Sequence, residues 1–127
     1  MRIAIVDDIA SERQTLRDGL DGQLSRLSLD ALVWGFGSGA EFLAAAEKER
    51  FDLVFLDIYM GDENGVDTAE ALRRFDRDCL LVFTTTSTDH ALDGFRVRAF
   101  HYLVKPWTDG DLAALFDEIV RRLPADD

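Results

Sequence analysis

The sequence predicts an α/β fold in which helices cover both faces of a doubly wound parallel sheet. Short apolar segments typical of strands alternate about five times with segments of helical periodicity, and the connections between them are short. This alternation implies right-handed crossovers and a parallel sheet. Residues 53–56 are apolar at every position, which indicates a central strand that is buried on both faces.

The first three strands are expected at residues 2–6, at residues 29–36 and in a segment that ends at Asp57. Between them, Ser11 to Gln14 and Ser38 to Glu41 have the capping-box pattern that opens a helix. Leucines at helical spacing follow the first box, and an Ala-rich segment follows the second. The first half of the chain therefore predicts three strands and two helices in alternation.

A Gly-rich turn follows the third strand and leads into a helix with apolar residues three positions apart. Residues 79–84 are expected to form the fourth strand, residues 88–95 a short helix and residues 102–104 the fifth strand. Lys105-Pro106 then breaks the chain, because proline has no amide hydrogen to donate. A last capping box opens a helix after Thr108, and its apolar stripe is expected to face the core.

The composition indicates one domain that covers residues 1–127 and does not cross a membrane. The chain has the size of an ordinary domain, and no apolar run is long enough to span a bilayer. The first six residues are too short for the core of a signal peptide and run directly into Asp7, so we expect a strand of a cytoplasmic protein. The single cysteine, Cys79, is expected to pack as a small hydrophobic residue.

The chain is strongly acidic. Its 14 Lys and Arg against 25 Asp and Glu give a formal net charge of -11, which argues against direct binding of nucleic acid or anionic lipid. Proteins and cations are therefore the expected partners. A solvated acidic surface that serves only solubility would also account for much of this charge.

Polar residues stand at the carboxyl ends of four predicted strands, namely Asp7 and Asp8, Asp57, Thr84 to Thr86, and Lys105. In a parallel sheet these ends meet at one edge, where open α/β folds bind ligands. Two carboxylates about 4 Å apart repel by roughly 1 kcal/mol in water and about 4 kcal/mol near a protein surface, so three call for a cation. Oxygen ligands suit Mg²⁺, and the sequence has no cluster of His and Cys for zinc.

Each of these residues also has a purely structural explanation. Asp57 by itself could be a solvated turn residue or a helix cap. Lys105 could neutralise one aspartate in a salt bridge, Thr85 could be an ordinary strand-end hydroxyl, and Tyr102 an ordinary half-buried ring. The functional interpretation depends on finding the whole set together.

In this order and spacing, the residues resemble the receiver domain of two-component response regulators, the phosphoacceptor module acted on by sensor histidine kinases. The resemblance covers essentially the whole chain. It rests on Asp7-Asp8, on the apolar strand that ends in Asp57 with Met60 and Gly65 after it, and on Thr85, Tyr102 and Lys105-Pro106. It implies a flavodoxin-like (βα)5 sandwich whose parallel five-stranded sheet has the order 2-1-3-4-5.

The resemblance also implies a phosphorylation site that contains a metal ion. Asp57 would take a phosphoryl group from a phosphohistidine, and Asp7, Asp8, Asp57 and the backbone carbonyl of Tyr59 would hold Mg²⁺ or Mn²⁺. The domain would then be a signalling module with self-phosphorylation and autodephosphorylation at Asp57, and not an enzyme with a separate substrate.

The remaining members of the set would sense the phosphoryl group. Mg²⁺ and the Lys105 ammonium would supply positive charge to its oxygens, which favours phosphoryl transfer to a carboxylate. Thr85, with Thr86 beside it, would bind the new acyl phosphate, and Tyr102 would turn into the space that Thr85 leaves.

The segment from residue 91 to residue 106 most closely resembles the receivers of LytTR-type (LytR/AgrA-like) transcription regulators. This implies that DNA is bound only through an output domain outside these 127 residues, which would be either a receiver excised from a longer regulator or a stand-alone one. It also implies a possible homodimer on phosphorylation. The expected output surface comprises the fourth helix, the fifth strand and the last helix. Trp107 is a candidate contact on it, and Lys105-Pro106 is a candidate cis peptide.

Three residues depart from the pattern of the family. Gly61 stands where proline usually follows Met60 and is expected to loosen the turn. Thr86 stands where Ala, Ser or Gly is usual, and Tyr59 is bulky beside Asp57. Both are expected to hinder water, so that the aspartyl phosphate hydrolyses slowly.

Three other classes of protein fit part of the pattern. A phosphatase of the haloacid dehalogenase type would need a second aspartate where Tyr59 stands, and a flavodoxin-like cofactor binder would need a hydroxyl and a glycine loop where Asp7-Asp8-Ile9-Ala10 stands. The main alternative is a receiver-shaped interaction module that is not phosphorylated. The three departures favour it, and the complete set of site residues argues against it.

Overall fold

The protein, described here by a computed structural model for residues 1–86 and 91–123, is built around a five-stranded parallel sheet. The strands are β1 (Arg2–Val6), β2 (Leu32–Phe36), β3 (Leu53–Asp57), β6 (Leu80–Thr85) and β7 (His101–Val104). Their order across the sheet is β2-β1-β3-β6-β7. This is the predicted order 2-1-3-4-5, because β4 (Tyr59–Met60) and β5 (Glu63–Asn64) form a separate two-stranded hairpin. The predicted fold is therefore confirmed.

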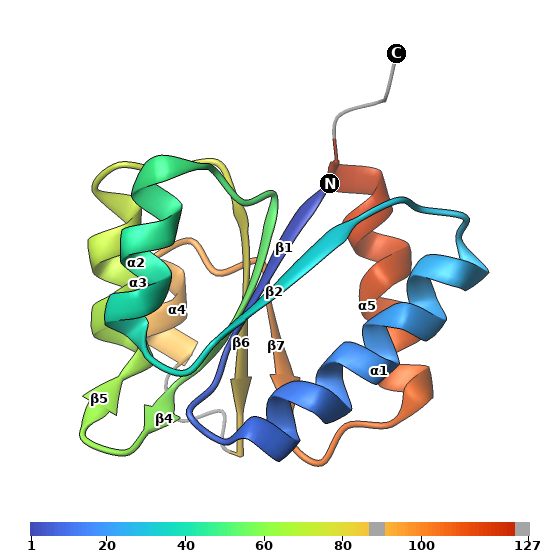
Figure 1. Cartoon of the computed structure of the whole chain (residues 1–127), viewed down its shortest axis with the longest axis horizontal. Coiled ribbons are helices and arrows are strands. Elements are labelled where there is room, and N and C mark those ends of the chain that lie inside the picture. The colour runs from blue at the N-terminus through green and yellow to red at the C-terminus, as the bar shows by residue number, and fades with distance from the viewer. Residues whose placement is uncertain (87–90, 124–127) are drawn as a thin grey trace.

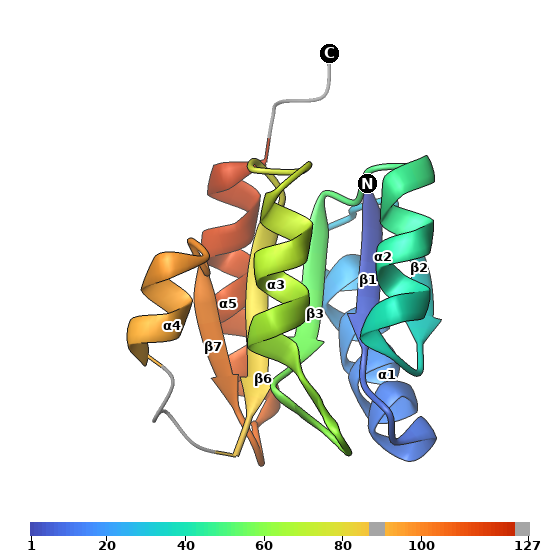
Figure 2. The same ribbon diagram turned by 90° about the vertical axis from the view of Figure 1, so that its left-hand side faces the viewer.

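Helices cover both faces of the sheet (Figures 1 and 2). On one face lie α1 (Ala10–Arg26) and α5 (Asp109–Arg122), and on the other lie α2 (Gly39–Lys48), α3 (Gly65–Arg73) and α4 (Ala91–Arg96). Within the described residues, no helix combines the length and the apolarity that crossing a bilayer requires.

The core consists of two layers, one on each face of the sheet, and β3 contributes to both. Val54 and Leu56 point to the layer beneath α2 and α3, while Leu53 and Phe55 point to the layer beneath α1 and α5. All four are fully buried, which explains why this strand is apolar at every position. Phe55 stacks on Phe116 of α5 with their ring centroids 6.4 Å apart. The core thus fixes β3, and with it the position of the carboxylate at its end.

Two predicted boundaries at the beginning of the chain are wrong. The second strand begins at Leu32 and not at residue 29, and α1 begins at Ala10 and not in a capping box at Ser11. The reason at α1 is the Asp7 carboxylate, which accepts a hydrogen bond of 2.9 Å from the amide of Ile9. This bond turns the chain into the helix earlier than the capping-box sequence suggests, and Ser11 lies inside the first turn.

The other two predicted helix starts agree better with the structure. Ser38 is the N-cap of α2 and accepts from the amide of Glu41, although the Glu41 carboxylate accepts from Gly37 and so does not complete the box. Thr108 and Asp111 form a complete capping box at α5. Each cap satisfies amides that the first turn of a helix leaves without a partner.

The segment around α4 differs in its limits from the predicted helix at 88–95. Residues 88–90 lie outside the described residues, and the described helix ends at Arg96. The guanidinium of Arg73, in α3, donates to the carbonyls of Val97 at 2.7 Å and of Arg98 at 3.0 Å. Arg73 therefore ties the end of α4 to α3 by satisfying carbonyls that the short helix leaves free.

The hairpin formed by β4 and β5 explains the first departure from the family pattern. Gly61 begins its two-residue turn and has a φ of 59°. Proline fixes φ near −65°, so it cannot occupy this position. Glycine at the first turn position with positive φ is typical of a type II′ hairpin turn. The turn is thus a defined hairpin in which proline could not replace Gly61, and the expectation that Gly61 loosens it stays a prediction.

Candidate functional site

Four strands deliver polar side chains to one edge of the sheet, as the sequence predicted. Asp7 follows β1, Asp57 ends β3, Thr85 ends β6 and Lys105 follows β7. These strands are neighbours in the sheet, and the arrowheads of all of them point to the same edge (Figure 2). The amide of Lys105 donates to the carbonyl of Thr85 at 2.7 Å, which extends the pairing of β6 and β7 to the site.

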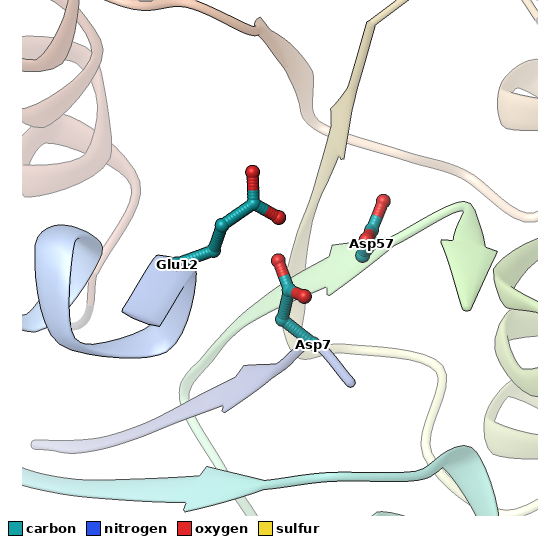
Figure 3. Close-up of side chains that lie close together, drawn as sticks. All are labelled: Asp7, Glu12 and Asp57. Carbon is teal, nitrogen blue, oxygen red and sulfur yellow. The ribbon is translucent and has the colours of Figure 1, made fainter. Parts of the chain in front are cut away.

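Three carboxylates meet at this edge. Asp7, Glu12 and Asp57 have carboxylate oxygens that all lie within 4.8 Å of one another, and the three side chains point toward one another (Figure 3). Asp7 and Asp57 are each only 4% exposed. Glu12 was assigned from the sequence to a capping box and was missed as a site residue. The available signal is its place in the first turn of a helix that directly follows β1, because that turn lies at the same edge.

The ammonium of Lys105 lies among these carboxylates. Its Nζ is 2.8 Å from Glu12 Oε2, 3.1 Å from Asp7 Oδ2 and 3.5 Å from Asp57 Oδ2. The salt bridge considered for Lys105 from the sequence therefore exists, and it lies inside the site. One cation shared by three carboxylates leaves a net negative charge.

Burial and like charge change the pKa of these groups. Burial, followed by the charge of Asp7, raises the pKa of Asp57 to about 6, although Lys105 and the amide of Tyr59 oppose the change. Burial also raises the pKa of Asp7. Burial lowers the pKa of Lys105, but its hydrogen bonds to Glu12 and Asp7 outweigh burial and raise it overall. The lysine is therefore charged at neutral pH, and an additional cation would relieve the repulsion among the carboxylates.

The other predicted metal ligands lie beside this cluster. Asp8 is exposed, and its Oδ2 is 3.6 Å from the position that a Cβ would occupy at Gly61. The amide of Tyr59 donates to Asp57 Oδ1 at 3.2 Å, while its ring is exposed. The structure thus brings Asp7 and Asp57 together with Glu12, and leaves Asp8 exposed beside Gly61 of the hairpin.

The predicted switch residues occupy different environments. Thr85 is fully buried, whereas Thr86 is exposed and lines a cavity of about 340 Å³ at the site. Tyr102 is half-buried and packs on Phe83, with ring centroids 5.7 Å apart. Its hydroxyl lies so close to α4 that a Cβ at Gly94 would overlap it.

The cavity runs from the carboxylates to an apolar wall on α1. It is lined by Asp7, Glu12, Thr15, Leu16, Thr84, Thr86, Lys105, Pro106 and Trp107. The Trp107 ring is half-buried and faces α1, where it lies 3.0 Å from the position of a Cβ on Gly19. The Lys105-Pro106 peptide is cis, as the sequence suggested.

Cys79 plays no part in this site. It is buried near the beginning of β6, and burial raises the pKa of its thiol to about 12. The thiol is therefore protonated at neutral pH, in agreement with its predicted role as a small hydrophobic residue.

Sequence comparisons identify relatives that share this pattern. The family model of the response regulator receiver domain matches residues 3–117. Sensory transduction protein LytT of Enterococcus faecalis is 30% identical over 123 residues, which are 97% of this chain and 49% of that protein. Transcriptional regulatory protein YpdB of Escherichia coli is 27% identical over 119 residues, which are 94% of this chain and 47% of that protein. The chain spans about half the length of these relatives.

Solved structures agree with the sequence comparisons. The response regulatory domain of MrkE from Klebsiella pneumoniae superposes with a TM-score of 0.83 at 24% identity and covers 95% of this chain and 96% of that one. The chemotaxis protein CheY4 of Vibrio cholerae superposes with a TM-score of 0.76 at 27% identity and covers 93% of this chain and 97% of that one. The resemblance to LytTR-type regulators is confirmed by LytT and YpdB among the relatives. The chain belongs to the response regulator receiver domain family.

Proposed function

We propose that this domain accepts a phosphoryl group on Asp57 from a phosphohistidine of a sensor histidine kinase. The observation that carries this proposal is the nearly buried Asp57 carboxylate at the end of β3, with the Lys105 ammonium 3.5 Å away. A carboxylate and an ammonium so placed can serve as the nucleophile and as one group, beside a bound cation, that stabilises charge during phosphoryl transfer.

In the proposed step, one carboxylate oxygen of Asp57 forms a bond to phosphorus. The bond between phosphorus and the donor imidazole nitrogen breaks, and its electron pair stays on that nitrogen. Lys105 then pairs with the oxygens of the acyl phosphate, and the Thr85 hydroxyl donates to one of them. The amide of Tyr59, which donates to Asp57 Oδ1, holds the carboxylate in its orientation.

The donor set of the site fits Mg²⁺ or Mn²⁺. Carboxylate oxygens of Asp7 and Asp57 lie within 4.8 Å of each other in the cluster, and hard oxygen ligands suit these cations. Asp7, Asp8, Asp57 and the carbonyl of Tyr59 are the proposed ligands. When bound, the cation would neutralise charge on the phosphoryl oxygens.

The output is proposed to pass through the surface formed by α4, β7 and α5. A hydrogen bond from Thr85 to the acyl phosphate would draw the end of β6 inward, and the Tyr102 ring would follow. Phe95 of α4, which is 86% exposed, and the exposed Val104 of β7 provide apolar contacts on this surface. Trp107 stays a predicted contact of this surface, although its ring packs against Gly19 of α1.

The proposed biological role is transcription control in a cytoplasmic phosphorelay. The relatives LytT and YpdB are about twice as long as this chain, which supports a LytTR-type DNA-binding output domain attached to a receiver of this kind. Homodimer formation on phosphorylation would bring two such output domains together. Slow loss of phosphate, because Tyr59 and Thr86 hinder water, is part of the proposal.

Intact mass measured before and after incubation with Mg²⁺ and acetyl phosphate tests the proposal. We expect one phosphoryl increment in the native protein and in the control Asp62→Asn, which removes an exposed carboxylate of the hairpin turn. Asp57→Asn is expected to show none. A native protein that gains no phosphoryl group from acetyl phosphate or from a phosphorylated histidine kinase would favour the alternative, an interaction module that is not phosphorylated.

A further inference from the structure

We propose that Glu12 is a positioning residue that draws the Lys105 ammonium toward the α1 side of the site in the unphosphorylated domain, so that Asp57 has the longest of its three carboxylate contacts. The inference rests on the proposed function, because it concerns the lysine that would bind the phosphoryl group. It assigns to Glu12 the task of restraining phosphorylation until Lys105 is released.

The distances around Lys105 support this assignment. The ammonium donates to Glu12 Oε2 at 2.8 Å and to Asp7 Oδ2 at 3.1 Å, whereas Asp57 Oδ2 lies at 3.5 Å. The shortest contact is thus with Glu12 of α1, and the longest is with the proposed nucleophile. For Lys105 to bind oxygens on a phosphorylated Asp57, its contact with Glu12 must weaken.

Glu12 is better suited than Asp7 to be a releasable partner. The Asp7 carboxylate is buried and also accepts from the amide of Ile9 at 2.9 Å, so it is fixed on both sides. The Glu12 side chain is 39% exposed, and within the described part of the chain its carboxylate binds Lys105 alone. Its longer side chain can turn to solvent while the backbone of α1 stays in place.

Figure 3 shows the three carboxylates that surround the position of Lys105. Glu12 reaches the site from the first turn of α1, opposite the end of β3 that carries Asp57. Lys105 follows β7 and extends into the space among the three carboxylates. The lysine can therefore pair with an oxygen on either side, and the balance between the two sides decides how ready Asp57 is to react.

The rate of phosphorylation by acetyl phosphate with saturating Mg²⁺ tests the inference. We expect Glu12→Gln to accelerate phosphorylation about two- to five-fold, the range that corresponds to the loss of a partly exposed ion pair. The matched control is Asp18→Asn, which removes the same charge from α1 at an exposed position and should leave the rate unchanged. An equal rate for Glu12→Gln and the native protein would overturn the inference.

The same substitution in a Lys105→Ala background separates positioning from simple charge repulsion. If Glu12 acts through Lys105, Glu12→Gln has no accelerating effect once the lysine is absent. An undiminished acceleration in that background would mean that Glu12 acts on the phosphodonor directly, and it would overturn the assignment.

A crystal structure of Glu12→Gln provides a readout that needs no phosphorylation. We expect the contact between Lys105 Nζ and Asp57 to shorten to hydrogen-bond distance, and an unmoved ammonium would contradict the inference. If the native protein is not phosphorylated but Lys105 moves in the variant, the proposed function fails and the positioning role stands. If the native protein is phosphorylated but Glu12→Gln changes neither the rate nor the position of Lys105, the role of Glu12 fails and the proposed function stands.

Discussion

Replacing Asp57 by asparagine should stabilise the metal-free protein at neutral pH, although it removes the proposed reactive group. Burial and neighbouring charge raise the pKa of Asp57 from 3.8 to about 6. At about 1.36 kcal/mol per pH unit, ionising this carboxyl at pH 7 costs the folded state about 3 kcal/mol. Asparagine has nearly the same shape and does not ionise, so the variant avoids this cost.

The pH dependence of this gain has a definite sign. Between about pH 4 and pH 6 the folded state binds more protons at Asp57 than the unfolded state, so this group makes the protein less stable as the pH rises through the interval. The advantage of Asp57→Asn should therefore be absent near pH 4, grow up to pH 6 and stay constant above it.

Urea unfolding without divalent cations, followed by tryptophan fluorescence at several pH values, measures this difference. Asp62→Asn is the control, because Asp62 is exposed and its removal should add little. Adding Mg²⁺ should stabilise the native protein and reduce the gap to Asp57→Asn. A variant that is no more stable than the native protein at pH 7, or a gain that does not change with pH, would refute the reasoning.

Three further predictions concern stability and use the same unfolding assay. Gly94→Ala should lower the free energy of unfolding by about 1–3 kcal/mol, because its methyl group would overlap the Tyr102 hydroxyl. Gly22→Ala is the control, because a methyl group at this position of α1 meets no other atom. It should raise the free energy of unfolding by about 0.5–1 kcal/mol, and a loss of stability would show that the effect at Gly94 is not due to overlap with Tyr102. Thr108→Ala should cost about 1 kcal/mol, because the hydroxyl that accepts from the Asp111 amide at 3.1 Å is lost; no change would show that this cap is dispensable.

The parts of the site that the sequence predicted are those that the parallel direction of the strands places at one edge of the sheet. A fully apolar strand ending in Asp57 must be central, and parallel neighbours must bring Asp7, Thr85 and Lys105 to the same edge. These conclusions need only hydrophobic periodicity and the handedness of crossovers. They do not depend on the contacts that individual side chains make.

The parts that the sequence missed depend on contacts between distant or competing groups. Glu12 joins the site because the Asp7 side chain binds the Ile9 amide and starts α1 at Ala10, a competition that the local capping pattern does not reveal. Gly61 adopts a positive φ at the turn of the hairpin. In the sequence it could be interpreted only as the absence of the usual proline. The prediction of the site was therefore limited by competition between side chains and by turn geometry. The topology of the sheet was predicted without this difficulty.

Phosphorylation of Asp57 is tested most directly by trapping the acyl phosphate with borohydride, which reduces a phosphorylated aspartate to homoserine. The protein is incubated with acetyl phosphate and Mg²⁺, reduced and digested, and the modified position is read by peptide mass spectrometry. We predict homoserine at residue 57 alone, and none when Mg²⁺ is removed by a chelator. Homoserine at another aspartate, or at none after phosphodonor treatment, would contradict the proposal that Asp57 is the phosphoacceptor.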